Sequence, residues 1–482
     1  MSTYLGRRGY SIYKECLNIN EQAMIRKDLK VTPFVPKSSI VKPSPFSIYR
    51  ESQRKFYLPR FYGLKTYGAP DEIQIGAGSP ISLAFKGSLR PYQIPAVEAY
   101  IKCAKNRGCG LLELYCGAGK TVCTLKIISI LGVKTLIIVH KSFLMNQWAE
   151  RIREFLPDAQ IGRIQGDIID VEGKDIVIAM LQSLSMREYP LTLFKDFGLT
   201  IIDEVHHISA EVFSRALFKV VTLKMLGLSA TMKRKDGLTK VFKMFLGDIV
   251  YSKKRDRCDN VLVKILHYRH IDEEYNRELF NFRGHVNYSG MIKKLCEFTP
   301  RSDFILRLLE DILTDEYEQQ IMILGHNKSL LFYLHDSIQE NDIASVGYYL
   351  GGMKEKDLKI TETKKIIVAT YQMAAEGLDI KTLNTLLMVT PKTDVCQAVG
   401  RILRRKEGKH LILDIVDSHP IFQRQWAKRR SYYKKEKYTI QEIELDNYIN
   451  KGEWITTFKN GEKCNKCKSK ASNLLTGKCL ID

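Results

Sequence analysis

Two blocks of the chain alternate short, continuous apolar runs with longer stretches of helical periodicity. In the first block the apolar runs cover residues 110–115, 135–139, 176–180 and 199–202, and in the second they cover 321–324, 366–369, 385–389 and 410–414. Short apolar runs separated by helical patterns are typical of strands buried on both faces in a parallel sheet. The pattern therefore predicts two successive α/β domains, each with a parallel sheet covered by helices.

The remaining segments differ in character and set the expected domain boundaries. The first 85 residues are rich in Pro, Tyr, Ser and Lys, and their prolines interrupt any long periodicity. The stretch before the second block is charged and aromatic without a clear period, which favours a connector carrying a strand or two. We therefore expect an N-terminal accessory segment at 1–85, a first α/β domain at 86–251, a connector at 252–300, a second α/β domain at 301–440, and a basic, cysteine-containing tail at 441–482.

The length of the chain fits more than one domain, and its charge suggests a polyanionic partner. A chain of 482 residues exceeds the usual size of one hydrophobic core. Lys and Arg number 75 against 54 for Asp and Glu, a formal charge of +21, which favours polyanions through counterion release. Nucleic acid is the first candidate partner, and an anionic membrane surface is its rival.

No stretch is long and apolar enough to span a bilayer, and the N-terminus is charged where a signal peptide would be apolar. We expect a soluble, intracellular protein without a membrane partner.

The cysteines point to a reducing compartment, with one candidate metal site. Most of the 11 cysteines are scattered through apolar or motif segments. Near the end of the chain, Cys464, Cys467 and Cys479 have spacings found in zinc knuckles. A structural zinc takes four ligands, so Asp482 or a remote residue would have to complete the site. The alternative is three reduced thiols without a metal.

A glycine-rich loop follows the first apolar run of the first block. Its residues are Cys116, Gly117, Ala118, Gly119, Lys120 and Thr121, and a helical pattern begins directly after them. In this strand, loop and helix context, glycine backbone amides and the helix N-terminus bind phosphate oxygens, Lys120 reaches the β and γ phosphates, and Thr121 binds Mg²⁺. Leu114 replaces the first glycine of the usual pattern. A chance glycine-rich turn is the alternative, but Gly-Lys-Thr at such a junction favours a nucleotide site.

Two adjacent acids follow the last apolar run of the same block. Asp203 and Glu204 come directly after residues 199–202. At the carboxyl end of a strand in the same parallel sheet they would lie beside the phosphate loop. Asp203 would hold Mg²⁺, and Glu204 would orient and deprotonate the attacking water. An isolated Asp-Glu pair is usually a solvated turn, but the apolar run before it and the loop upstream favour the catalytic interpretation.

With further segments, these motifs resemble those of superfamily 2 helicases. The matching segments are Gly117-Ala118-Gly119-Lys120-Thr121 (motif I), Asp203-Glu204-Val205-His206 (motif II), 227–231 (motif III), 374–379 (motif V) and 397–404 (motif VI). The resemblance implies two tandem RecA-like domains. Within the superfamily, the segments 89–93, 116–121, 203–207 and 227–236 are most similar to the XPB and UvsW branch and to the transcript-release helicases of poxviruses and other large DNA viruses. No such motif is found in residues 1–85 or in the last sixty or so.

The resemblance also implies roles for individual residues. Gln93 would read the adenine edge, and Arg401 and Arg404 would be arginine fingers from the second domain that stabilise charge on the transferring phosphoryl group. Gly377 and Asp379 would couple these fingers to the first domain. Ser229 and Thr231 would link hydrolysis to domain movement. Residues 136–141 with Gln147, and Gln182 with Ser183, would contact the nucleic-acid backbone.

The sequence thus favours an enzyme that uses ATP and Mg²⁺ to unwind or remodel DNA or an RNA–DNA hybrid. The viral resemblance points to transcript release or termination, with the transcription machinery as a further partner and, for a viral protein, the host cytoplasm, viral factory or virion as its location. The alternatives are a repair or recombination translocase and a nucleic-acid-binding scaffold with a vestigial ATPase. The basic segment 423–437, with Trp426, Tyr432 and Tyr433, would stack on bases or would be a solvated helix.

Overall fold

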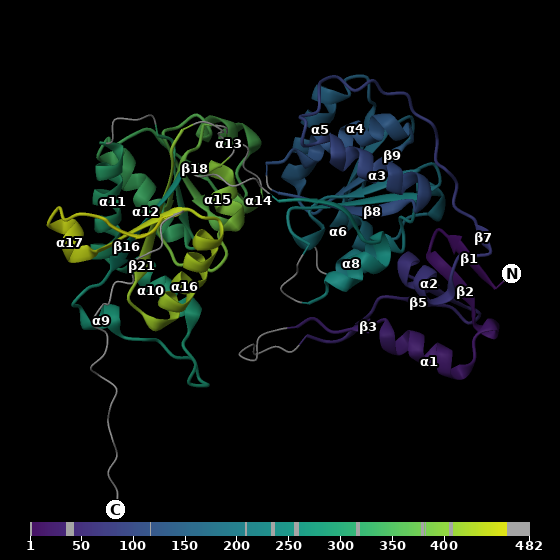
Figure 1. Ribbon diagram of the computed structural model, residues 1–482, viewed down its shortest axis with the longest axis horizontal. Helices are drawn as coiled ribbons and strands as arrows, with labels where there is room; N and C mark the ends of the chain where they lie inside the picture. Colours follow the sequence, from purple (N-terminus) through teal and green to yellow (C-terminus); the bar gives the residue numbers. More distant parts are fainter. Residues whose placement is uncertain are drawn as a thin grey trace, which may run out of the picture. The chain divides into compact units, whose positions relative to one another are not determined.

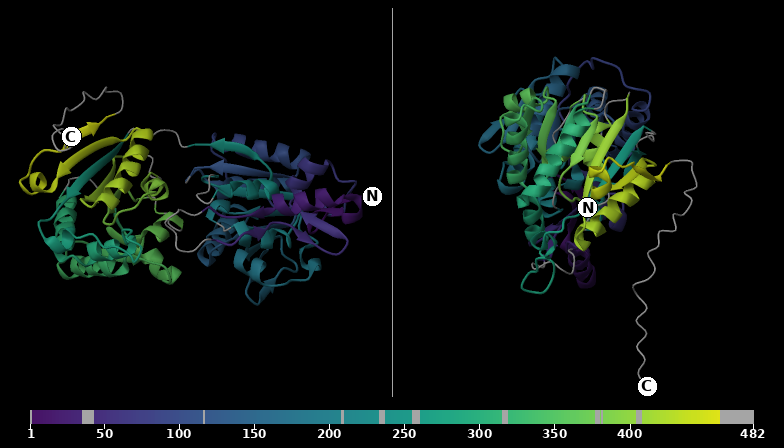
Figure 2. Two further views of the ribbon diagram at one scale, coloured as in Figure 1. Left: turned by 90° about the horizontal axis from the view of Figure 1, so that it is seen from below. Right: turned by 90° about the vertical axis from the view of Figure 1, so that its left-hand side faces the viewer.

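The chain forms two compact units, Met1–Arg255 and Asp256–Asp482, each built around an eight-stranded sheet (Figures 1 and 2). This arrangement comes from a computed structural model, which describes residues 2–34, 43–115, 117–207, 210–232, 237–254, 260–314, 319–376, 380, 382–403 and 408–459. Both sheets are largely parallel and flanked by helices, which confirms the predicted α/β class with two RecA-like domains.

The first sheet has the strand order β11-β10-β12-β9-β13-β14-β8-β15, and only the β10–β11 pair is antiparallel. Its strands are β8 (Cys109–Leu114), β9 (Thr135–Val139), β10 (Ile161–Gln165), β11 (Ile168–Asp170), β12 (Ile176–Met180), β13 (Leu199–Ile202), β14 (Lys224–Ser229) and β15 (Ile249–Lys253). The accompanying helices are α3 (Ile94–Asn106), α4 (Lys120–Leu131), α5 (Ser142–Phe155), α6 (Leu181–Met186), α7 (Ala210–Leu217) and α8 (Thr239–Leu246), with short 3₁₀ turns η2 (Leu191–Phe194) and η3 (Val205–His207).

Both faces of this sheet are buried, which explains its continuous apolar runs. Along β9, Ile137 lies in one apolar cluster together with residues of α3, α4 and α5. Its neighbours Leu136 and Ile138 lie in a second cluster with residues of α7 and α8. Successive side chains of a strand point to opposite faces, so helices on both sides of the sheet require an apolar residue at nearly every strand position. The four strands predicted in this block are confirmed as β8, β9, β12 and β13.

The N-terminal residues fold into a smaller sheet that belongs to the same unit. Its strands β1 (Thr3–Gly6), β2 (Gly9–Tyr13), β5 (Arg50–Glu51), β6 (Lys55–Leu58) and β7 (Glu72–Ile73) have the order β5-β6-β2-β1-β7. The same region contains η1 (Lys14–Cys16), α1 (Ile19–Asp28), α2 (Arg60–Tyr67) and the short pair β3 (Lys30–Val31) and β4 (Phe46–Ser47).

The smaller sheet shares its apolar core with the first large sheet. Tyr10 and Phe56 are fully buried in the same cluster as Phe242 of α8. Arg60 of α2 is 8% exposed, and its guanidinium donates to the carbonyl oxygens of Leu223 at 2.8 Å and of Arg107 at 3.0 Å, at the amino ends of β14 and β8. The segment expected to be an accessory is therefore an integral part of the first unit.

The second sheet has the order β18-β19-β17-β20-β21-β16-β22-β23, and only the β22–β23 pair is antiparallel. Its strands are β16 (Val261–Tyr268), β17 (Ile321–Gly325), β18 (Val346–Tyr349), β19 (Ile366–Thr370), β20 (Thr385–Met388), β21 (His410–Asp417), β22 (Thr439–Glu444) and β23 (Ile455–Phe458). Its helices are α9 (Glu273–Asn276), α10 (Tyr288–Glu297), α11 (Thr299–Leu313), α12 (Lys328–Glu340), α13 (Glu355–Thr361), α14 (Tyr371–Glu376), α15 (Cys396–Ile402), α16 (Pro420–Lys435) and α17 (Leu445–Ile449).

The second unit extends beyond the boundaries expected from sequence. The four predicted strands are present as β17, β19, β20 and β21. However, β16 comes from the expected connector and pairs with both β21 and β22. Strand β23, from the expected tail, pairs with β22 at the edge. Connector and tail thus supply strands of the second sheet.

Helix α16 corrects the interpretation of the basic, aromatic segment 423–437. Trp426 is 5% exposed and Tyr433 is fully buried in the core of the second unit. Arg429 of the same helix forms a buried, bidentate ion pair with Asp414 of β21, with nitrogen–oxygen distances of 2.6 and 2.9 Å. Because these side chains pack inward, Trp426 and Tyr433 hold the helix on the sheet and do not present a surface for base stacking.

Among the helices of the described residues, none has the length and apolar character that crossing a membrane requires.

We predict that Gly63→Ala lowers the melting temperature of the protein. A Cβ atom at Gly63 would lie 2.2 Å from Cγ of Tyr10, so α2 could not keep its place on β2. Overpacking of this kind costs about 1–3 kcal/mol. Gly76→Ala is the matched control, because a Cβ at Gly76 meets no atom within 4 Å. Equal melting temperatures for the two variants in thermal denaturation would show that α2 is not packed on β2 in this way.

Candidate nucleotide site

The phosphate loop connects β8 to α4, as its sequence predicts. Gly117 and Gly119 have φ angles of 90° and 80°, values that residues with a Cβ adopt only at a cost. Helix α4 begins at Lys120, and Gly119 provides no side-chain cap. Since the first amides of a helix have no partner within it, this end can bind an anion. Cys116 lies outside the described residues.

Gln93 contacts this loop directly. Its Nε2 donates to the carbonyl oxygen of Ala118 at 2.9 Å, and its Oε1 accepts from the backbone amide of Arg90 at 2.9 Å. A Cβ at Gly119 would lie 2.3 Å from this Nε2 and would displace the Gln93 side chain, and the φ angle of Gly119 also favours glycine. In the structure, the Gln93 side chain thus supports the phosphate loop through a hydrogen bond. Recognition of adenine by this side chain stays a prediction.

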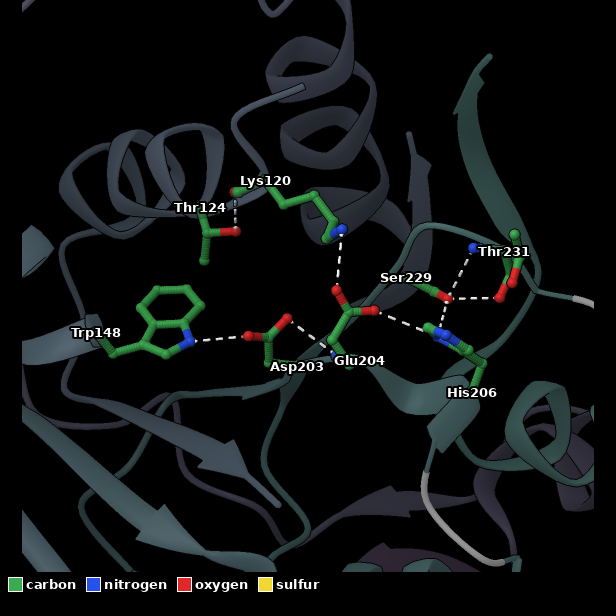
Figure 3. Close-up of polar contacts among 8 residues, drawn as sticks. All are labelled: Lys120, Thr124, Trp148, Asp203, Glu204, His206, Ser229 and Thr231. Carbon is green, nitrogen blue, oxygen red and sulfur yellow. Dashed lines mark hydrogen bonds and ion pairs between the residues drawn. The ribbon is translucent and has the colours of Figure 1, made fainter. Parts of the chain in front are cut away.

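Asp203 follows β13 and is held by a partner that the sequence did not reveal. Trp148 of α5 donates its indole N–H to Oδ2 of Asp203 at 2.9 Å, and the amide of Glu204 donates to Oδ1 at 2.9 Å (Figure 3). Asp203 is 7% exposed and Trp148 is 2% exposed. Burial, assisted by the neighbouring charge of Glu204, raises the pKa of Asp203 to about 6. A carboxylate with such a pKa is typical of functional sites.

Glu204 contacts the lysine of the phosphate loop. Its Oε1 lies 3.1 Å from Nζ of Lys120, and its Oε2 lies 3.3 Å from Nδ1 of His206. The φ angle of Glu204 is 48°, in the left-handed region that a residue with a Cβ rarely occupies. Strain of this kind is found where the position of a side chain matters more than local stability. The sheet thus brings the predicted loop lysine and the predicted acid together.

A chain of polar contacts continues from His206 to the segment after β14. Nδ1 of His206 lies 2.7 Å from Oγ of Ser229, and this hydroxyl donates to the carbonyl oxygen of Thr231 at 2.5 Å (Figure 3). Ser229 has a single hydroxyl proton, which this bond uses, so His206 donates from Nδ1. The network therefore connects Lys120 through Glu204 to the 229–231 segment.

The candidate residues of the second unit are only partly described. Arg401 of α15 is 6% exposed and donates from Nε to the carbonyl oxygen of Ala374 in α14 at 2.9 Å. This bond joins the segments assigned to motifs V and VI. Arg404, Gly377 and Asp379 lie outside the described residues, as do the zinc candidates Cys464, Cys467 and Cys479. Across the residues that are described, no group of three or more His, Cys, Asp or Glu side chains is arranged to hold a metal.

Comparisons with known proteins identify relatives of this chain. Residues 86–234 match the family described as "Type III restriction enzyme, res subunit". The chain is 34% identical over 463 residues to the "Putative ATP-dependent RNA helicase" of Acanthamoeba polyphaga mimivirus, which covers 93% of this chain and 88% of the relative. It is 26% identical over 409 residues to the "DNA 3'-5' translocase XPB2" of Sulfurisphaera tokodaii, covering 74% of this chain and 89% of that one.

Solved structures support the fold. Saccharomyces cerevisiae Dbp5 bound to RNA and ADP BeF3 has a TM-score of 0.52 at 13% identity, covering 75% of this chain and 96% of that chain. The type ISP restriction-modification enzyme LlaBIII bound to DNA has a TM-score of 0.51 at 16% identity, covering 75% of this chain and 32% of that chain.

Fold, site and relatives together define an ATP-hydrolysing motor that acts on nucleic acid. The chain belongs to the superfamily 2 helicases.

We predict that Trp148→Phe shifts the acid limb of the ATPase pH profile to higher pH. The indole hydrogen bond lowers the pKa of Asp203, so its loss raises a pKa that already stands at about 6. Asp203 is ionised above its pKa, and only the ionised carboxylate would hold Mg²⁺, so activity should fall as pH drops through that value. The variant should also need roughly tenfold more Mg²⁺ for half-maximal turnover.

The phenylalanine keeps most of the ring packing, so a melting temperature near that of the unaltered protein is the control for this variant. An unchanged pH profile and an unchanged Mg²⁺ requirement would show that the indole does not act through Asp203.

Proposed function

We propose that the first unit binds ATP with Mg²⁺ on the 116–121 loop and that Lys120, Asp203 and Glu204 are its catalytic groups. The observation that carries this proposal is the 3.1 Å contact between Nζ of Lys120 and Glu204. It places the phosphate-binding cation beside the acid that would activate water. Asp203 and the hydroxyl of Thr121 are hard oxygen donors that suit Mg²⁺, which would neutralise charge on the phosphates.

In this proposal Glu204 orients the water that attacks the γ phosphate and accepts its proton. Lys120 turns from Glu204 towards the β and γ phosphates when nucleotide enters, which leaves one oxygen of Glu204 available to water. The other oxygen of Glu204, Oε2, lies 3.3 Å from Nδ1 of His206. Because His206 also contacts Ser229, a change at Glu204 would reach the segment that follows β14.

The second unit would contribute positive charge to the same reaction. Arg401 and Arg404 are proposed as arginine fingers, with Gly377 and Asp379 as the coupling segment. The bond from Arg401 to Ala374 supports this pairing, because it ties the finger to the helix that precedes residues 377–379. Gln93 is proposed to sense adenine while it braces the phosphate loop. Zinc binding by Cys464, Cys467 and Cys479 stays a separate prediction.

For the substrate, we propose DNA or an RNA–DNA hybrid, in transcript release or termination of a viral transcription system. Viral relatives named as putative ATP-dependent RNA helicases support a substrate that contains RNA, such as the hybrid. The archaeal relative named as a DNA translocase supports the second candidate, a repair or recombination translocase. A scaffold with a vestigial ATPase is disfavoured, because Lys120, Asp203 and Glu204 are present and in contact.

We expect Glu204→Gln to retain nucleotide binding and to lose at least about 100-fold in nucleic-acid-stimulated turnover, since an amide cannot accept the proton of water. Lys120→Ala should lose nucleotide binding itself, because the phosphates lose their cation. Glu98→Gln, at an exposed position of α3, is the control and should leave both properties unchanged. Steady-state turnover and binding of a fluorescent nucleotide check these outcomes, and full activity of Glu204→Gln would remove that acid from the mechanism.

The substrate is tested by measuring ATP turnover and strand displacement on duplexes of DNA, RNA and hybrid with 3′ or 5′ overhangs. We expect DNA and hybrid to stimulate turnover more than RNA duplex, with an effect that weakens as salt rises. Displacement of RNA from a hybrid favours transcript release, whereas translocation on DNA without displacement favours the repair role. Stimulation by RNA duplex alone contradicts the proposed substrate.

A further inference from the structure

A tight hairpin lies between β16 and α10 in the second unit, at residues 280–286. Phe280 and Val286 pair as an antiparallel bridge, and the amide of Asn281 donates to the carbonyl oxygen of His285 at 2.8 Å. Oδ1 of Asn281 accepts from the amides of Arg283 at 3.0 Å and His285 at 3.1 Å. The turn is therefore fixed by its own hydrogen bonds.

The base of this 280–286 hairpin is anchored to the second unit. The amide of Asn287 donates to the carbonyl oxygen of Leu279 at 2.7 Å, and its side chain caps α10 by accepting from the amide of Gly290 at 3.1 Å. Leu279 packs against the apolar core, where Met291 is buried. A preformed element binds with less loss of conformational entropy than a loop that must become ordered.

The hairpin lies at the edge of the second sheet that holds the carboxyl ends of the parallel strands. The segment that leads to it leaves β16 at the carboxyl end of that strand, beside the carboxyl end of the parallel strand β21. Tyr288, the first residue of α10, donates its hydroxyl to the carbonyl oxygen of Pro391 at 3.3 Å, and Pro391 lies just beyond β20. Ligands of open parallel sheets bind outside this edge.

The tip of the hairpin exposes aromatic rings to solvent. Phe282 is 81% exposed and Phe280 is 58% exposed, although both rings would be more stable when buried. The guanidinium of Arg283 lies 5.2 Å from the centre of the Phe282 ring. Within the described part of the chain, Arg283 forms no ion pair with a carboxylate. The tip thus offers one flat apolar face beside one available positive charge.

We propose that the 280–286 hairpin binds an unpaired base of single-stranded nucleic acid, with Phe282 stacked on the base and Arg283 paired with a neighbouring phosphate. No acidic residue occurs between Leu279 and Asn287, which suits a polyanion. A guanidinium interrupts the small apolar surface, whereas a protein interface of useful affinity requires a broader patch. Stacking needs no base identity, as suits a motor that moves along any sequence. The proposal rests on the nucleic-acid activity proposed above.

The test measures binding of the full chain to labelled single strands of DNA and RNA by fluorescence anisotropy, with matched strands that contain abasic sites. Phe282→Ala should weaken binding to base-carrying strands about fivefold or more. It should not change binding to abasic strands, which keep the phosphates and lack the stacking partner. Phe282→Trp keeps an aromatic ring and should bind base-carrying strands like the unaltered protein. Arg283→Ala should lower the slope of log affinity against log salt by about 0.7 on both kinds of strand.

Ile19→Ala is the matched control, because Ile19 is 84% exposed and lies in the other unit. It should bind like the unaltered protein, and the ATPase rate without nucleic acid should be the same in every variant. Equal binding of Phe282→Ala and the unaltered protein to base-carrying strands overturns the proposal, as does an equal loss on abasic strands.

A change in self-association of Phe282→Ala on sedimentation, without a change in strand binding, would instead assign the tip to a second copy of the chain. If the unaltered protein binds no strand of any kind, the proposed function is wrong, and so is the proposal that the 280–286 hairpin binds nucleic acid.

Discussion

The site depends on the parallel register of three strands in the first sheet. Strand β14 lies between β8 and β13 and pairs in parallel with both. The carboxyl ends of all three strands therefore meet at one edge, where β8 leads to Lys120, β13 leads to Asp203 and Glu204, and β14 ends at Ser229. These residues are far apart in sequence, and no local interaction would bring them together. Hydrogen bonding of the sheet thus does the positioning, and the side-chain contacts complete it.

Two neighbouring residues of the site adopt locally unfavourable states. Asp203 keeps its carboxyl in a buried position that raises its pKa, and Glu204 adopts a left-handed backbone. Either feature alone would be unfavourable in an ordinary turn. The surrounding contacts offset this cost, since Trp148 donates to one acid and Lys120 pairs with the other. The turn after β13 is therefore held by groups from α4 and α5, outside its own sequence.

Strands buried on both faces could be predicted from sequence, because a short, continuous apolar run between helical patterns is typical of such strands. The phosphate loop and the acid pair were also evident, since each is a short local motif beside such a run. Trp148 was not, because an indole on an amphipathic helix looks like any core residue until the fold brings Asp203 to it. The stretch that holds β16 is charged and aromatic without a clear period, so the sequence predicts only a connector with a strand or two. Within β16, Lys264 and His267 interrupt the apolar pattern. In the fold, Lys264 lies 5.1 Å from the centre of the Trp454 ring, and His267 bonds Glu442 of β22 at 2.9 Å.

The N-terminal sheet has a consequence for how this chain could have evolved. Tyr10 and Phe56 share one apolar core with Phe242. Arg60 donates to backbone carbonyl oxygens that precede β8 and β14. The boundary between the small sheet and the large sheet of the first unit is therefore a hydrophobic interior. A region joined in this way cannot be gained, lost or exchanged between lineages as a separate module without exposing that interior. Its buried residues should instead vary in concert with those of α8, against which they pack. Such paired variation would mark the first 85 residues as inherited along with the motor from the start.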